Sequence, residues 1–389
     1  MSFIGRWLRI SHISSGFIAV LVGYTSSVAI VFQAASAAGA NAAQLGSWMW
    51  ALGIGMGLTC IGLSLVWRTP ILTAWSTPGA ALLATSLGDI GMAQAIGVFL
   101  FASALITLCG VTGWFQRIMD YMPRNLANAM LAGILLQFGL ALFGAVRGQA
   151  GLVLLMFATF IVARRLLPRY AVPLAFLAGI LWTAGLGALD LRGLDWAPAH
   201  PVWMAPEFSW PALLGIGIPL FIVTMTSQNV PGLAVLRANG YHTPASPLIT
   251  WTGLTGIAFA PLGGFSFNLA AITAAICMSS DADPEAAQRY KASVWAGLFY
   301  LATGIFGATV VGLFAAFPRE LVAAIAGLAL LGTLGASISE SLRESEGREA
   351  ALVTFLATAS GMSLLGVGSS AFWGLVLGGA CHALARWRR

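Results

Sequence analysis

Charged residues are scarce in this chain. Only 8% of its 389 residues are Asp, Glu, Lys or Arg, against about a quarter in soluble domains. The 13 acidic residues fall in loops or at the ends of apolar runs, so no run offers a carboxylate in its interior. The sequence contains no Walker motif, no Ser-His-Asp arrangement and no cluster of side chains at metal-ligand spacing. These absences argue against an enzyme or an ATP-driven pump, and we expect neither a metal nor a cofactor.

Cysteine is scarce as well. The four cysteines form no CxxC pair, and all fall inside apolar runs: Cys60, Cys109, Cys277 and Cys381. Small buried thiols are the interpretation that this placement favours.

Long hydrophobic runs dominate the remainder. Hydrophobic residues make up 59% of the chain, and the mean hydropathy is +0.88. A run of about 20 apolar residues crosses a bilayer as a helix, so we expect an all-α polytopic membrane protein. The first run is too long for a cleavable signal peptide, and we interpret it as a retained helix. About fourteen spans are predicted: 13–35, 45–66, 70–87, 92–115, 125–145, 149–167, 171–189, 211–233, 246–262, 264–280, 292–316, 319–337, 350–366 and 369–386.

The basic residues predict the orientation of these spans. With the N terminus in the cytoplasm, sixteen of the 19 Lys and Arg residues lie on the cytoplasmic side. The outer side then holds only Arg147, Arg192 and Arg319. This bias follows the positive-inside rule and predicts cytoplasmic N and C termini. It also accounts for the net charge of +6 without a nucleic-acid partner, because the arginines are scattered over short loops.

The chain divides into two halves of seven spans. The long hydrophilic connection at 190–210 separates a first repeat, 1–189, from a second, 211–389. Halves with an odd number of spans must have opposite orientations in the membrane. "MPRNLANAMLAGILL" (122–136) and "FPRELVAAIAGLALL" (317–331) match at a shift close to half the chain. Inverted repeats of this kind are typical of secondary transporters, whereas a channel more often has a pore-loop signature.

The third and tenth spans carry polar breaks. In "TAWSTPGAAL" (73–82), we expect Thr77 to be the N-cap of a half-helix and Pro78 its first residue. In "GGFSFNLAAITAAI" (263–276), Ser266 or Asn268 is the expected cap, with a helix over 269–278. Each span would then be a short extended segment followed by a half-helix. Two half-helix N termini would provide an anion site, although a simple proline kink is the alternative for "STPG".

The eighth span is unusually polar in its middle. Residues 224–229 read "TMTSQN" and are followed by Pro231 and Gly232. The first span, its counterpart in the other half, has Thr25, Ser26 and Ser27 at mid-span. Such side chains face either a substrate pocket or a neighbouring helix that they hydrogen-bond.

These motifs, with "TSQNVPGLAVLRANGY" (226–241), resemble those of the benzoate/proton symporter (BenE) family of bacterial inner membranes over essentially the whole chain. That family is similar in architecture to nucleobase and sulfate carriers. The resemblance implies a core domain, about 13–115 and 211–316, that moves against a gate domain, about 125–189 and 319–386. It also implies a substrate site between the third and tenth spans.

The resemblance implies proton-coupled uptake of benzoate or a related aromatic carboxylate, with the proton and the lipid bilayer as the other partners. Nucleobase carriers have glutamates where this chain has Gln228 and Asn229, or Phe267 and Asn268, and that difference suits an anion. Another small organic anion or a nucleobase is the alternative substrate, and a channel or structural protein comes third. The sequence leaves the oligomeric state open, with a homodimer as one state to consider. The expected substrate-binding residues are Tyr24, Thr25, Trp75, Ser76, Thr77, Gly79, Gln228, Asn229, Ser266, Phe267 and Asn268.

Overall fold

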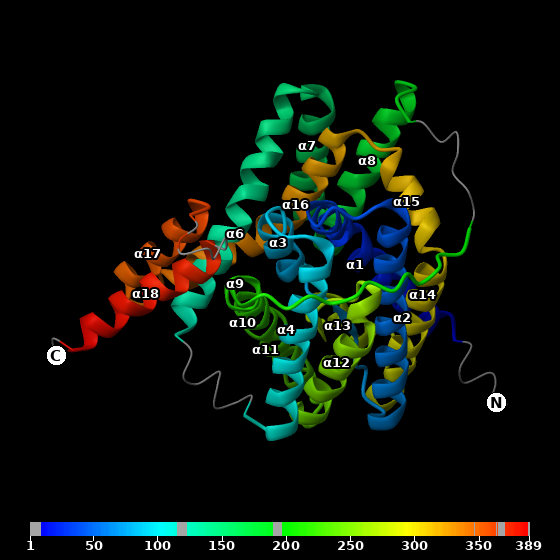
Figure 1. Cartoon of the computed structure of the whole chain (residues 1–389). Helices are drawn as coiled ribbons and strands as arrows, with labels where there is room; N and C mark the ends of the chain where they lie inside the picture. Colours follow the sequence, from blue (N-terminus) through cyan, green and yellow to red (C-terminus); the bar gives the residue numbers. More distant parts are fainter. Residues whose placement is uncertain are drawn as a thin grey trace.

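The computed structural model describes residues 9–114, 123–189, 197–345, 347–362, 364 and 370–387. Parts of the predicted 190–210 connection and of the "MPRN" segment lie outside these residues. The described chain is predominantly helical (Figure 1). The elements of the first half are α1 (Ile10–Ala37), α2 (Ala42–Trp67), β1 (Thr73–Trp75), α3 (Thr77–Ser86), α4 (Met92–Thr112), α6 (Arg124–Gly144), η2 (Ala145–Arg147), α7 (Ala150–Leu166), η3 (Pro168–Tyr170) and α8 (Ala171–Gly185).

The second half begins with one helical run over Trp210–Ala238, which contains two π-helical turns. In order, its elements are α9 (Trp210–Ala212), η4 (Leu213–Gly217), α10 (Ile218–Thr224), η5 (Met225–Asn229), α11 (Val230–Ala238), α12 (Ala245–Phe259), η6 (Ala260–Leu262), β2 (Phe267–Leu269), α13 (Ile272–Met278), η7 (Ala286–Gln288), α14 (Tyr290–Ile305), α15 (Gly307–Ala315), α16 (Arg319–Ser341), α17 (Arg348–Ala359) and α18 (Ser370–Trp387).

The protein is a helical membrane protein. Six described helices are long and apolar enough to cross a membrane, and α14 with α15, bent by 65°, forms a seventh candidate. Each predicted span range contains helix. The remaining ranges hold shorter or broken helices, so the count of fourteen crossings stays a prediction.

The third and tenth predicted spans are broken, and their extended segments pair with each other. β1 and β2 are antiparallel, with Thr73 opposite Leu269 and Trp75 opposite Phe267. The ladder continues at both ends through Ser76 N to Ser266 O at 3.1 Å and Ala270 N to Leu72 O at 2.9 Å. Backbone N–H and C=O groups cannot stay unpaired in a bilayer. Pairing between the halves is therefore what allows each helix to be interrupted.

Glycines allow the helices around this pair to approach closely. Gly53 of α2 meets Gly304 of α14, where a Cβ added to Gly304 would lie 3.0 Å from the Cα of Gly53. Small residues at such crossings are the usual basis of helix packing in membranes.

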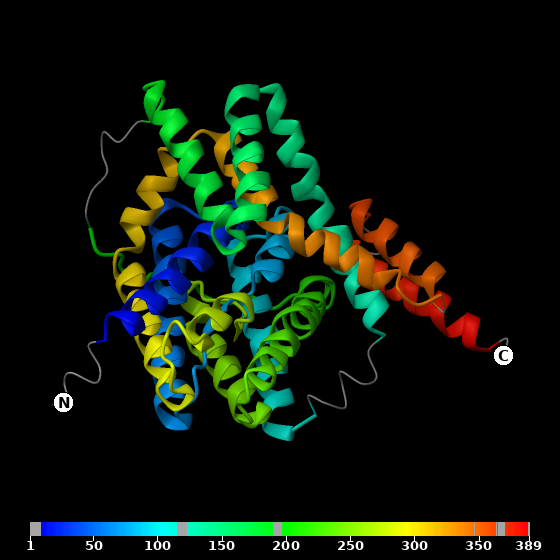
Figure 2. The same ribbon diagram turned by 180° about the vertical axis from the view of Figure 1, so that it is seen from behind.

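The remaining helices form a second group. α6 packs against α16 and α17, α7 packs against α8, and α17 packs against α18. Figures 1 and 2 show α17 and α18, in orange and red, at one side of the molecule, away from α2 and α14. This second group contacts the helices around the β1–β2 pair at several places. Among them, α1 packs against α8 and α16, and α3 packs against α6.

Candidate functional site

A cavity of about 380 Å³ lies beside the β1–β2 pair. Its wall comes from both halves of the chain. The polar and aromatic lining residues are Ser26, Ser27, Trp75, Thr77, Ser227, Gln228, Thr273, Tyr300 and Thr333. The apolar lining residues are Val22, Gly23, Met56, Ala74, Pro78, Pro168, Val172, Pro231, Ala270, Ala271, Ile272, Ala329 and Leu330. No acidic or basic side chain is among them.

Trp75 forms an aromatic wall of the cavity and is held in one orientation. Its indole Nε1 donates to Ser27 Oγ at 2.8 Å, and Ser27 donates in turn to Gly23 O at 2.8 Å. The Tyr24 ring packs edge-on against the indole, with centroids 5.0 Å apart. Tyr24 itself does not line the cavity. Of these two predicted site residues, Trp75 lines the cavity and Tyr24 packs behind it.

The first turn of α3 differs by one residue from its prediction. Thr77 is not the N-cap; Ser76 is, because its backbone is extended and its hydroxyl accepts the N–H of Gly79 at 3.0 Å. Pro78 therefore stands at the second helical position. Ala80 N donates to Ser76 O, and proline has no N–H. In this turn the backbone N–H without an acceptor inside the helix is therefore that of Thr77. Thr77 lines the cavity.

The cap of the other half-helix was predicted wrongly. α13 begins at Ile272, and no side chain caps it at Ala271. The strand β2 takes up the residues before it. Asn268 Nδ2 donates to Ser266 O at 3.0 Å instead of capping the helix. Ser266 has a positive φ of 41°, so it forms a bend before the strand.

Asn229 supports β2 and does not face the cavity. It is fully buried, and its Oδ1 accepts the N–H of Leu269 at 3.0 Å. Its Nδ2 donates to Met225 Sδ at 3.1 Å. The side chain thereby satisfies a backbone donor of the broken span.

Gln228, its neighbour, lines the cavity. Both residues lie in the π-helical turn η5, which ends two residues before Pro231. Proline lacks the N–H that an α-helix requires, and the wider turn accommodates it without ending the helix. Among the described residues, Gln228 has no hydrogen-bond partner for its amide, so the amide remains available to a ligand.

Tyr300 supplies a second free donor. It is buried in α14, and it lines the cavity with no hydrogen-bond partner for its hydroxyl among the described residues. A Cβ added to Gly23 would lie 3.3 Å from this hydroxyl, which places it against α1. Ser26 and Ser227, by contrast, donate to carbonyls of their own helices.

The two phenylalanines of the tenth span lie away from the cavity. Phe267 packs against Phe259, with centroids 6.2 Å apart, and Phe265 packs against Trp48 and Phe99. Both are fully buried. Thr25, whose hydroxyl donates to Leu21 O at 2.7 Å, is also outside the lining.

The structure therefore brings Trp75, Thr77 and Gln228 together at the cavity. Other predicted residues help to hold the backbone of the broken spans beside the cavity: Ser76, Gly79, Asn229, Ser266 and Asn268. Sequence reasoning missed Tyr300, Thr273 and Thr333 as lining residues, because each is an isolated polar residue in an apolar run. Ser26 and Ser27 had a signal, since hydroxyls cluster at the middle of the first span.

The cavity can bind a small, partly aromatic molecule through uncharged donors. Within the described residues, no group of His, Cys, Asp and Glu could hold a metal ion. An indole face and the Gln228 and Tyr300 donors can be desolvated at far lower cost than charged side chains. No carboxylate among the described lining residues would repel an anion.

The fold is that of membrane transporters. The structure superposes on SLC26A9 with a TM-score of 0.64 over 96% of this chain and 65% of that one, at 13% identity. It also superposes on the transmembrane domain of the cyanobacterial bicarbonate transporter BicA, with a TM-score of 0.56, 97% and 96% coverage and 13% identity. At such identities the likeness concerns the fold alone.

The sequence narrows this class to one family. Residues 7–384 match the model of the BenE family, described as benzoate membrane transport protein. The chain is 48% identical over 370 residues to the inner membrane protein YdcO of Escherichia coli, covering 95% of this chain and 94% of that protein. It is 42% identical over 364 residues to the benzoate membrane transport protein of Acinetobacter baylyi, covering 94% and 92%. The chain belongs to the BenE family and is a multi-pass transporter of the bacterial inner membrane, not an enzyme.

Proposed function

We propose that this protein carries benzoate or a related aromatic carboxylate into the cell together with a proton, and that the cavity beside β1 and β2 is its substrate site. One observation carries the proposal: an aromatic wall and free uncharged donors surround a cavity that has no acidic side chain among its described lining residues. The name of the Acinetobacter baylyi relative, a benzoate membrane transport protein, supports the choice of substrate. A volume of about 380 Å³ is within the range of small-molecule sites.

In this proposal the ring of the substrate lies against Trp75 and its carboxylate meets Gln228, Tyr300 and the N–H of Thr77. Hydrogen bonds from neutral donors to a charged group contribute about 1.5–3 kcal/mol each. The positive end of the α3 dipole lies on the same side and adds to them.

The substrate crosses by alternating access between two domains. The core consists of α1–α4 and α9–α15, and the gate consists of α6–α8 and α16–α18. The cavity has walls from both, because Thr333 and Leu330 belong to α16 while Trp75 and Gln228 belong to the core. Movement of the core against the gate would therefore open and close the site.

The inverted repeat is part of the same proposal, and the helix contacts support it. α2 packs against α14, and α4 packs against α12. In the proposed repeat α2 corresponds to α12 and α4 to α14, so each of these contacts is the counterpart of the other. The same holds for α1 with α13 and α3 with α10, and for α1 with α8 and η4 with α18. Pro123 and Pro318 each stand immediately before a helix, α6 and α16, and these two helices pack together. Fourteen spans with both termini in the cytoplasm fit this arrangement.

A nucleobase is the second candidate substrate, because the Gln228 amide both donates and accepts hydrogen bonds. Uptake by the purified protein in proteoliposomes separates the candidates. We expect saturable uptake of labelled benzoate that rises with an inward proton gradient, and no competition by uracil or adenine. Absence of saturable uptake of any aromatic acid would contradict the proposal, while uptake that ignores the gradient would remove only the coupling.

A further inference from the structure

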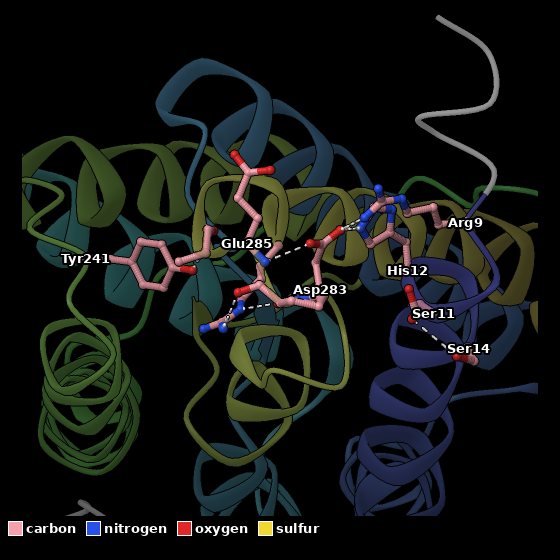
Figure 3. Close-up of polar contacts among 10 residues, drawn as sticks. Arg9, Ser11, His12, Ser14, Tyr241, Asp283 and Glu285 are labelled. Carbon is pink, nitrogen blue, oxygen red and sulfur yellow. Dashed lines mark hydrogen bonds and ion pairs between the residues drawn. The ribbon is translucent and has the colours of Figure 1, made fainter. Parts of the chain in front are cut away.

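A cluster of ionisable side chains lies outside the cavity, where the start of α1 meets the loop between α13 and α14 (Figure 3). His12 Nε2 lies 2.8 Å from Asp283 Oδ2, and Arg9 Nη1 lies 2.7 Å from the same oxygen. Asp283 Oδ1 accepts the N–H of Glu285 at 2.9 Å. Arg9 and His12 thus approach the carboxylate from one element, while the loop provides the acceptor.

Burial sets this cluster apart. Of the acidic and basic side chains in the described part of the chain, three are buried: His12 at 0% exposed, Asp283 at 1% and Lys291 at 5%. The charged groups that face His12 are Arg9 from its own segment, Asp283 from the loop and Lys291 from α14. The other charged side chains whose burial is described lie at least partly exposed, so the buried ones are gathered at one point.

The hydrogen bonds determine which ring nitrogen carries the proton. An ionised carboxylate only accepts, so His12 Nε2 must be the donor to Asp283. The other nitrogen, Nδ1, is buried and has no partner among the described residues. A proton taken up there would strengthen the attraction to Asp283, but it would leave a buried N–H unbonded and add a positive charge beside Arg9 and Lys291, and the cost of burying the charge outweighs the attraction. Proton uptake therefore favours an arrangement in which His12 is hydrated and the loop has moved.

Both segments of this contact continue into the cavity. His12 lies ten residues before Val22 of α1, and Asp283 lies ten residues after Thr273; Val22 and Thr273 both line the cavity. Within α1 the ten residues span about 15 Å, while the second segment is helical only as far as Met278 and continues as a loop. Arg289 ties the loop to the end of α13, since its Nη1 donates to Met278 O at 2.8 Å and its Nε to Asp283 O at 2.7 Å. A change at His12 can thus reach the second broken span through a short, hydrogen-bonded segment.

We propose that His12 and Asp283 form the proton-binding site of this transporter, and that breaking their contact links proton uptake to movement of α13 at the substrate cavity. The inference rests on the proposed proton-coupled transport and names the groups that carry the coupling. One proton is exchanged in each cycle. His12 Nδ1 gains it from water as the imidazole becomes an imidazolium, and loses it to water when the contact with Asp283 reforms. By linkage, substrate must then change the proton affinity of His12, as the proton changes the affinity for substrate.

Two modes of transport in proteoliposomes test the assignment with labelled benzoate. Counterflow at equal pH measures binding and exchange, and net uptake under an inward proton gradient measures coupling. We expect His12→Gln to keep counterflow within about twofold of wild type and to lose all stimulation by the gradient. The matched control is His242→Gln, because His242 is exposed and follows Tyr241, whose hydroxyl donates to Ala286 O of the same loop. This control should keep both modes.

Gradient stimulation that survives in His12→Gln would overturn the assignment while leaving the proposed function intact. A wild type that exchanges benzoate but ignores the gradient would overturn the coupling and this site together, and a wild type without counterflow would overturn the proposed function itself. A purely structural ion pair would reduce both modes equally.

A measurement on the wild type covers the case in which His12→Gln does not fold. In protein labelled with ¹⁵N-histidine, benzoate should raise the pH at which the His12 ring loses its proton. If the pH at which the His12 ring loses its proton is the same with and without benzoate, the inference is contradicted.

Discussion

Asn229 and Leu269 are joined by a hydrogen bond of 3.0 Å from the backbone N–H of Leu269 to the side-chain oxygen of Asn229. This contact ties the polar turn of one predicted span to the strand of the tenth. It explains why an apolar helix carries an asparagine at mid-span: the broken span exposes a backbone donor, and the asparagine accepts from it in a place where water is scarce.

Replacing Asn229 with Ala should therefore destabilise the protein. A buried N–H without an acceptor costs about 1–3 kcal/mol, and the strand pair beside the cavity loses its fixed register. We expect a lower Tm in detergent and weaker substrate binding, measured by thermal unfolding and by benzoate titration. For the Tm measurement Gln228→Ala is the control, since its amide bonds nothing in the described chain; equal loss of Tm in both variants would contradict this role.

Trp75 and Ser27 should act as one unit. Trp75→Phe removes the indole N–H that Ser27 accepts, and a lost hydrogen bond of about 1 kcal/mol corresponds to roughly fivefold in affinity. Ser27→Ala should weaken benzoate binding by a similar factor. In the double variant the effects should not add, because both remove the same contact. Additive losses in a double-mutant cycle would show that Ser27 does not orient the ring.

The carboxyl of Asp283 makes stability depend on pH. Burial by itself raises its pKa, but hydrogen bonds from Glu285 N–H and His12, together with Arg9, outweigh this and hold the pKa below its ordinary value. A depressed pKa stabilises the fold at pH values above the ordinary value, about 3.9, and this contribution is lost as pH falls through the folded value. Asp283→Asn should lower stability at neutral pH and remove part of the acid dependence below about pH 4. A wild-type Tm that does not change between pH 3 and pH 7 would contradict the contact.

The sequence was sufficient for the class, a helical membrane protein, and for the position of the two breaks. Apolar runs and the "STPG" and "GGFSFN" interruptions follow directly from what a bilayer allows. It was not sufficient for the caps. Serine and threonine stand side by side before Pro78, and only the geometry of the β1–β2 pair decides that Ser76 accepts the Gly79 N–H.

Prediction of the site was limited for a related reason. Adjacent polar residues on a helix point in different directions, so Gln228 faces the cavity while Asn229 faces β2. A wide π-helical turn changes these directions further. The sequence placed Phe267 among the expected substrate-binding residues, but packing against Phe259 holds its ring in the core. Tyr300 comes from a different span, and no local pattern marks it.

The central claim is that an anionic carboxylate binds beside Gln228, and a change of charge at that position tests it most directly. Gln228→Glu preserves shape and adds a negative charge within about 5 Å of the bound anion; at an effective dielectric near 20 the repulsion is about 3 kcal/mol, or roughly a hundredfold in affinity. Gln228→Ala should cost about 1.5–3 kcal/mol, as for one hydrogen bond to a charged group. The measurement is benzoate binding to purified wild type and both variants from pH 5 to pH 8. We predict a large loss for the Glu variant at pH 8 that shrinks as the pH falls and the new carboxyl takes up a proton, whereas Glu-variant binding as tight as wild type at pH 8 would contradict the site.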